Sequence, residues 1–133
     1  MASVGTHKPP AAIRKAEEKN LIRASLSSYN QSPRKVRLVT DLVKGKSVEA
    51  ALAELGFLPK RAAEPIAKLI ASAAANAKAQ GANPANLRVE NITVNSAGML
   101  VKFMPRAMGR AAKVRRRKSQ VSVILAEGKA KKK

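Results

Sequence analysis

The spacing of apolar residues predicts three helices between residues 32 and 80. The first lies in the stretch SPRKVRLVTDLVKG, where Ser32 suits the N-cap, Pro33 the first helical position and Gly45 the position after the last turn. Its apolar residues recur every three or four positions, namely Val36, Val39, Leu42 and Val43. This spacing is typical of a helix that buries one face.

Two further helices are predicted after it. Ser47 suits the N-cap of a short helix that ends at Gly56. The next runs from about Pro59 to Gln80, and Pro65 should either kink it or mark where its regular part begins. The residues expected to face inward are Val48, Ala51, Leu52 and Leu55 in the short helix, and Ile66, Leu69, Ile70, Ala73 and Ala77 in the long one. The many alanines indicate a close approach to a sheet or a neighbouring helix.

Alternating patterns predict strands before and after the helices. Residues 20–28, NLIRASLSS, alternate loosely. In residues 87–95, LRVENITVN, apolar residues occupy positions 87 and 89 and then 92 and 94, and this shift of phase indicates a β-bulge or a strong twist. The alternation is clean in QVSVILAE, where the apolar positions are Val121, Val123 and Leu125. We therefore expect residues 87–95 and 118–126 to pair in one sheet.

The chain between these two strands must leave the sheet and return, so a hairpin is predicted. Its turn is expected over residues 105–109, PRAMG, where proline and glycine suit turn positions. Each arm would be about 11 residues long and would project roughly 35 to 40 Å at ~3.3 Å per residue. A domain of this size has a radius of gyration of only about 14 Å. A hairpin with no sheet or helix behind it is marginally stable in water, so we expect something outside the chain to complete it.

The alternative for this region is a disordered basic tail over residues 102–133, where twelve cations and one acid fall. The clean alternation at 119–125 disfavours that alternative, because tails do not usually return to a core strand. Only residues 127–133 are expected to be a disordered basic tail. Residues 1–19 are expected to be a flexible basic extension, with a short helical piece at 11–18.

Charge narrows the choice of partner. The 133 residues carry a formal net charge of +19, a field that attracts polyanions. In residues 103–119, seven of seventeen side chains are cationic and none is acidic. Arginine binds phosphate bidentately, and each neutralised phosphate releases counterions, so we interpret the hairpin as an RNA-contacting finger. Because Tyr29, Phe57 and Phe103 are the only aromatic residues, recognition should run through phosphate, 2′-OH and shape rather than base-stacking platforms.

Two smaller groups of residues allow more than one interpretation. Arg34, Lys35 and Arg37 either lie on a solvated helix face or bring a helix N-terminus, with its positive dipole, against phosphate. The arm methionines either pack along the arm or are simply tolerated there, and they are Met99, Met104 and Met108.

The sequence carries no motif of catalysis or metal binding. It has no GxxxxGK[ST] loop, no GxSxG and no cysteine, and His7 has no partner ligand, so neither an enzyme nor a cofactor or metal site is expected. The helix acids, expected to pair with nearby cations, are Asp41, Glu49, Glu54 and Glu64. No apolar run reaches the ~20 residues of a spanning helix, and the N-terminus does not resemble a secretory signal. An intracellular protein is expected.

Three stretches resemble the family of bacterial large-subunit ribosomal protein twenty-two. They are MPRAMGRA at 104–111, SPRKVRLVTDLVKGKSVEAAL at 32–52 and SAAANAKAQ at 72–80, and the resemblance covers about residues 20–126. It implies an α+β fold, with three helices packed on a small three-stranded antiparallel sheet and a long protruding β-hairpin. Residues 20–126 would then form one rRNA-binding domain that includes the hairpin at about 95–118.

The resemblance also implies a function. The protein would be a structural constituent of the large ribosomal subunit in the cytoplasm, would support early subunit assembly and would contact several domains of the large rRNA. Its hairpin tip would line the nascent-peptide tunnel beside ribosomal protein L-four, where changes in the family alter macrolide sensitivity. Relatives often carry a cation where this chain has Met108.

The resemblance and the charge pattern together name the candidate site residues. Those expected to bind rRNA are Arg23, Ser32, Arg34, Lys35, Arg37, Lys44, Arg88, Lys102, Arg106, Arg110, Lys113, Arg115, Arg116, Arg117 and Lys118. Those expected at the tunnel tip are Met104, Pro105, Arg106, Ala107, Met108, Gly109 and Arg110.

Two other classes of protein were weighed against this interpretation. A DNA-compacting protein with a minor-groove arm would usually insert an apolar wedge and form an intimate dimer. A membrane-active protein would need a long amphipathic helix, whereas the most basic stretch here contains proline and glycine. The partners expected are therefore rRNA, neighbouring ribosomal proteins and the nascent peptide, without a membrane and without a second copy of this chain.

Overall fold

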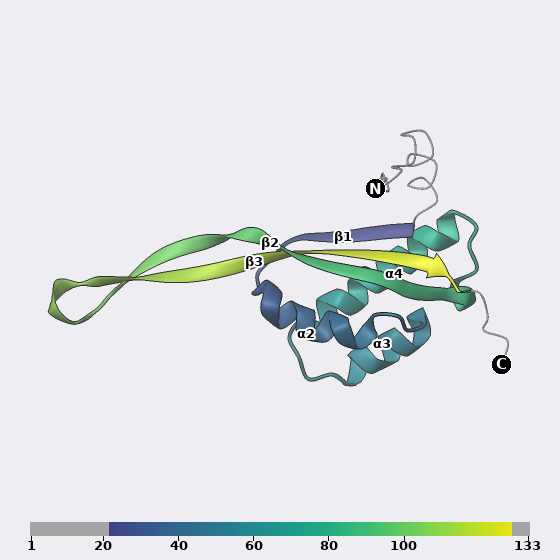
Figure 1. Cartoon of the computed structure of the whole chain (residues 1–133), viewed down its shortest axis with the longest axis horizontal. Helices are drawn as coiled ribbons and strands as arrows, with labels where there is room; N and C mark the ends of the chain where they lie inside the picture. The colour runs from purple at the N-terminus through teal and green to yellow at the C-terminus, as the bar shows by residue number, and fades with distance from the viewer. Residues whose placement is uncertain (1–21, 129–133) are drawn as a thin grey trace, which may run out of the picture.

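Residues 22–128 are the part of the chain that this computed structural model describes (Figure 1). In chain order the main elements are β1 (Ile22–Tyr29), α2 (Pro33–Val43), α3 (Val48–Phe57), α4 (Ala63–Ala79), β2 (Leu87–Pro105) and β3 (Ala111–Glu127). The predicted α+β class is confirmed. The expectations for residues 1–19, including the helical piece at 11–18, and for most of the tail at 127–133 lie outside the described residues.

The three strands form one antiparallel sheet in the order β1-β3-β2, so the last strand lies in the middle. β1 and β2 both run antiparallel to β3, and the three helices connect these two edge strands. The register of β2 against β3 shifts between Val89 and Asn91, which confirms the bulge expected from the change of phase. In Figure 1 the helices lie together on one side of the sheet.

The core lies between the helices and the sheet face that they cover. It takes the alternate residues Val121, Val123 and Leu125 from β3, as predicted. The whole predicted inner face of the long helix is also buried, from Ile66 to Ala77. Its buried alanines let α4 approach the sheet closely. The helix begins at Ala63 rather than at Pro59, and Pro65 falls in its first turn, where a missing N–H costs no intrahelical hydrogen bond.

One core prediction for the first helix is wrong. Leu42 is 46% exposed, whereas Thr40 is 2% exposed and its Oγ1 donates to the carbonyl of Arg37 at 3.1 Å. The buried stripe is Val36, Val39, Thr40 and Val43, which follows i, i+3, i+4 and i+7. Leu42 lies four residues after Leu38, on a different side of the helix, and both leucines are exposed.

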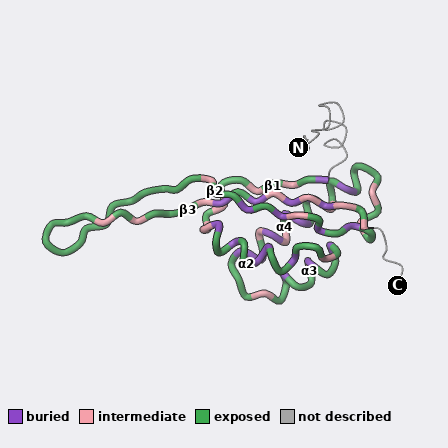
Figure 2. Tube along the Cα trace, in the orientation of Figure 1, coloured by how far each residue is buried: buried purple, intermediate pink, exposed green. Residues whose placement is uncertain are grey.

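β2 and β3 continue past the sheet as a two-stranded arm. Beyond Ser96↔Ser119 the register shifts once, near Gly98 (φ 88°), and then runs unbroken from Met99↔Arg117 to Pro105↔Ala111. Figure 1 shows the arm projecting well away from the helices. Figure 2 shows that the buried residues stop where the arm begins. The predicted long hairpin is therefore confirmed.

The turn of the arm is narrower than the five residues predicted for it. Pro105 is still paired in the ladder, and the N–H of Arg106 donates to the carbonyl of Arg110 at 2.8 Å. The chain reverses through Met108 (φ 59°, ψ 36°) and Gly109 (φ 67°). Two successive residues with positive φ are typical of type I′ turns, whose twist matches that of the flanking strands.

Candidate nucleic-acid interface

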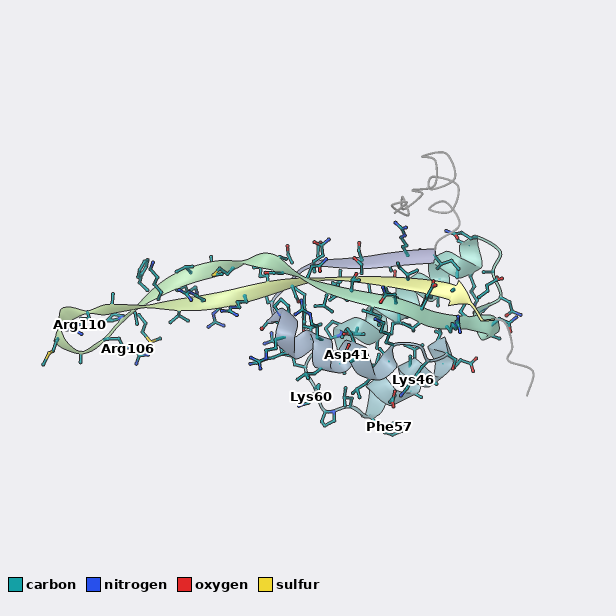
Figure 3. All side chains as sticks on the ribbon, in the orientation of Figure 1. Asp41, Lys46, Phe57, Lys60, Arg106 and Arg110 are labelled. Atoms are coloured by element: carbon teal, nitrogen blue, oxygen red, sulfur yellow. The ribbon has the colours of Figure 1, made fainter. Side chains whose placement is uncertain are left out.

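The arm, residues 96–118, carries eight cations and no acid. Lys102 lies on β2, Arg106 and Arg110 flank the turn, and the remaining cations lie on β3, namely Lys113, Arg115, Arg116, Arg117 and Lys118. Figure 3 places Arg106 and Arg110 at the far end of the arm, well away from Asp41 on the helical side of the molecule. The charged side chains of the arm are therefore all positive along its length.

Where the arm leaves the body, four of these arm cations lie together with two cations of the body. We call this group the basal cluster: Lys35, Arg61, Arg115, Arg116, Arg117 and Lys118. These residues line an open hollow of about 860 Å³, together with Ser32 and residues 30 and 31. They come from α2, from the segment before α4 and from β3, so the fold gathers them from three separate parts of the chain. A hollow with six cations and no acid suits a polyanion.

Hydrogen bonds hold the walls of this hollow together. The hydroxyl of Tyr29 shares its single hydrogen between two acceptors, Oε1 of Gln31 at 2.8 Å and, more weakly, the carbonyl of Arg61 at 3.4 Å. Ser32 then starts α2, and its carbonyl accepts from the N–H groups of Lys35 and Val36. The end of β1, the start of α2 and the segment before α4 are thus joined beside the base of the arm.

Side chains, more than backbone N–H groups, give the start of α2 its capacity to bind anions. Ser32 is the N-cap residue, as predicted, but its hydroxyl makes no capping hydrogen bond. Pro33 has no N–H to offer, and the N–H of Lys35 already donates to Ser32. The helix dipole and the side chains of Ser32, Arg34 and Lys35 remain available for a phosphate.

Arg37 makes a contact within the fold. Its Nη2 donates to the carbonyl of Val94 at 2.8 Å, across from α2 to β2. This hydrogen bond fixes the helix to the edge strand close to the base of the arm. The sequence suggested two roles for Arg37, a solvated helix face or a phosphate contact, and the structure adds this third one.

Three of the predicted rRNA-binding residues lie apart from both the arm and the basal cluster. Arg23 lies on the exposed face of β1, and Lys44 follows the last turn of α2. Arg88 lies near the start of β2, opposite Ala126, at the end of the sheet away from the arm. The structure therefore does not unite all the predicted residues in one surface.

Arg61 was missed by reasoning from the sequence. It stands alone between two helices, next to Lys60, and nothing in its immediate sequence distinguishes it from an ordinary surface cation. Only the hydrogen bond from Tyr29 to its carbonyl brings it beside Lys35 and the arm. Tertiary structure was needed to find it.

Two of the four helix acids expected to pair with nearby cations do so. Glu54 pairs with Lys46, and Glu64 pairs with Lys68 at 2.8 Å, whereas within residues 22–128 Asp41 and Glu49 form no ion pair. The hydrogen bond and the charge of Lys68 lower the pKa of Glu64 below its usual value. Both pairs are exposed and of the kind that contributes little to stability.

No group of three or more potential metal ligands occurs within residues 22–128. Among the helices that the structure describes, none is long and apolar enough to cross a membrane.

Comparison with known proteins gives a consistent result. Residues 24–126 match the family described as ribosomal protein L22p/L17e. The chain is 49% identical over 107 residues to the large ribosomal subunit protein uL22 of Citrifermentans bemidjiense, covering 80% of this chain and 96% of that protein. The same figures hold for the uL22 protein of Geobacter sp. strain M21. The uL22 protein of Geobacter sulfurreducens is 45% identical over 105 residues, covering 78% of this chain and 95% of that protein.

These matches confirm the resemblance seen in the three sequence stretches, and they span the helices, the sheet and the arm. The chain therefore belongs to the ribosomal protein L22p/L17e family, whose members are structural proteins of the large ribosomal subunit and not enzymes.

Proposed function

We propose that the chain, a structural constituent of the large ribosomal subunit in the cytoplasm, binds the large rRNA through its arm and its basal cluster. The observation that carries this proposal is the arm itself. It has eight cations, no acid and no buried hydrophobic residue of its own between residues 96 and 118. A hairpin of this kind gains its stability from what it lies against, and rRNA supplies the opposite charge.

The two cationic surfaces have different roles in this proposal. The basal cluster, together with Ser32 and Arg34, grips the rRNA backbone where the arm enters, because arginine forks hold phosphates in fixed orientations. Lys102 and Lys113 follow the rRNA along the arm. Arg23, Lys44 and Arg88 reach other rRNA segments, which suits a protein that contacts several domains of the RNA.

The tip has a further role in the proposal. Residues 104–110 line the nascent-peptide tunnel, beside ribosomal protein L-four. Met108 is 95% exposed at the turn, so its side chain stands free at the end of the arm. In the tunnel it presents a neutral thioether to the nascent chain. By contacting several rRNA domains, the chain also takes an early part in subunit assembly.

The domain division predicted from the sequence is part of the same proposal. Residues 20–126 act as one rRNA-binding domain. The segments 1–19 and 129–133 at its two ends lie outside the described residues, and β3 itself continues to Glu127.

The test is sedimentation of the tagged protein from a lysate of its own cells, with washes of increasing salt. The protein should remain with the large subunit after loosely bound basic proteins are removed. A matched variant with Arg115, Arg116 and Arg117 changed to glutamine should wash off at lower salt. Release of the unaltered protein at low salt, or its sedimentation with DNA or membrane, would contradict the proposal.

A further inference from the structure

The register of the arm places an apolar row and a cationic row side by side on one face. Directly opposite pairs in an antiparallel ladder lie on the same face, and every second residue along a strand does too. The three pairs on this face are Met99↔Arg117, Val101↔Arg115 and Phe103↔Lys113. All the apolar members come from β2 and all the cations from β3. We call these six residues the mixed face.

The apolar row of the mixed face is open to solvent. Phe103 is 67% exposed, Met99 53% and Val101 41%. Phe103 is the only aromatic residue between positions 96 and 118. Met99, for which packing along the arm was one of two expectations, is thus half exposed. An apolar row of this length on a highly charged arm is typical of a surface that meets a partner.

The partner must match both rows at once. It needs negative charges for Arg115, Arg117 and Lys113, and flat apolar surfaces for the row beside them. A fully paired RNA helix offers phosphates and 2′-OH groups but keeps the faces of its bases stacked inside. Unpaired nucleotides offer phosphates together with free base faces, and bases of any type stack on aromatic side chains.

Resting on the proposed rRNA-binding function, we propose that the mixed face binds unpaired RNA nucleotides, with one base stacked on Phe103. This single exposed ring changes the expectation, drawn from the shortage of aromatic residues, that stacking takes no part in recognition. The phosphates beside that base lie on Lys113 and Arg115, which neighbour Phe103 across the ladder. Val101 and Met99 extend the apolar surface toward the basal cluster. The arm thus recognises a local single-stranded feature of its RNA, in addition to the backbone contacts that charge alone provides.

The test compares a short unstructured oligoadenylate with an RNA duplex that has the same number of phosphates, both against the full chain at fixed salt. Changing Phe103→Leu should weaken binding to the single strand roughly tenfold, and leave the duplex affinity and the salt dependence unchanged. Phe103→Trp should restore the single-strand affinity. The matched control is Phe57→Leu, because Phe57 is 90% exposed at the end of α3, remote from the arm, and this change should alter neither affinity.

A charge variant separates this inference from the proposed function. Lys113→Gln should weaken binding to both RNAs and lower the slope of log affinity against log salt by about 0.7 for the single strand. If Phe103→Leu changes neither affinity, or weakens both equally, stacking is refuted while rRNA binding through charge stands. If the unaltered chain binds neither RNA and does not enter the subunit, both proposals fail.

A second measurement uses the assembled large subunit. Ultraviolet light joins an aromatic side chain to a base stacked on it without a linker, and mass spectrometry then identifies the two partners. A cross-link from Phe103 to an rRNA nucleotide supports the inference. A cross-link from Phe103 to another protein, or the absence of one when other protein–RNA cross-links form, overturns it.

Discussion

Arg37 was predicted to bind RNA, but its side chain makes a hydrogen bond within the protein, to the carbonyl of Val94. We expect Arg37→Ala to lower the free energy of unfolding by about 1 to 3 kcal/mol, because the change removes a charge-assisted hydrogen bond and leaves the carbonyl of Val94 without this donor. Urea unfolding of the free protein measures this loss.

The matched control for this prediction is Arg34→Ala, which removes the same charge from an exposed position on the same helix. It should change the free energy of unfolding by less than about 0.5 kcal/mol while weakening RNA binding. Equal stability of the two variants would show that the Arg37 hydrogen bond does not hold α2 to β2.

Met108 is a poor residue for its position in the turn. Its φ of 59° lies in the left-handed region, which asparagine tolerates better than methionine. We expect Met108→Asn to stabilise the tip by about 0.5 to 1 kcal/mol, seen as slower amide exchange at Arg106 and Arg110 in the free protein. The melting temperature of the domain should not change, because the tip makes no contact with the core. Faster exchange at the tip would contradict this account of the turn.

At the scale of single residues the sequence predicts some positions well and others poorly. Strict alternation correctly predicted that Val121, Val123 and Leu125 are buried, because helices cover one face of the sheet and leave the other face open. Hydropathy alone predicted that Leu42 is buried and that Thr40 is not. Thr40 can be buried because its hydroxyl donates a hydrogen bond to the helix backbone. Arg61 could not be found, because its position depends on a contact between residues 32 apart in the sequence.

Among the elements, the arm differs most from the rest of the fold. We predict that replacing residues 97–118 by an Asn-Gly turn, which joins the register partners Ser96 and Ser119, leaves a folded domain. Its free energy of unfolding should change by about 1 kcal/mol or less, because no residue of the arm belongs to the core. Its affinity for RNA should fall at least about tenfold, because eight cations are lost.

Circular dichroism and calorimetry measure the first effect, and RNA titration measures the second. A control variant that keeps the arm, with Arg115, Arg116 and Arg117 changed to glutamine, should lose RNA affinity and remain as stable as the unaltered chain. Unfolding of the arm-less variant at ordinary temperature would show that the arm contributes to the core after all.

The alanines of α4 set how closely this helix lies to the sheet. We expect Ala73→Leu to cost about 1 to 3 kcal/mol of stability, because Ala73 is fully buried and a larger side chain must push the helix away. The control is Ala75→Leu, at an exposed position two residues later in the same helix, which should be nearly neutral. Thermal unfolding measures the stability of both variants, and equal stability would contradict close packing of α4 against the sheet at Ala73.

The sequence predicted the type and order of the three α-helices and the three strands, but it was less accurate at their boundaries. The long helix begins at Ala63 because residues before it serve as a link to α3, and proline at position 65 suits a first turn. The turn of the arm is Ala107–Gly109 rather than residues 105–109, because Pro105 can pair at the edge of a two-stranded ladder. Local sequence propensity does not determine where a helix begins or where the pairing of two strands ends.

The shape of the whole molecule follows from where its apolar residues lie. The core residues all belong to the body formed by the helices and the sheet, and the arm extends beyond them with eight cations. Together with a net charge of +19, this division gives a folded body and an arm whose charge suits a partner of opposite sign. Membership in the L22p/L17e family identifies the assembly in which such a partner is found.

The most direct measurement is amide hydrogen exchange of the full chain, free in solution and in the assembled large subunit. In the free protein, residues 99–105 and 111–117 should exchange rapidly, while residues 119–126 of the sheet are protected. In the subunit the arm should become protected as well, because rRNA encloses it. Strong protection of the arm in the free protein, or rapid exchange of the arm in the subunit, would contradict the account of an arm that rRNA completes.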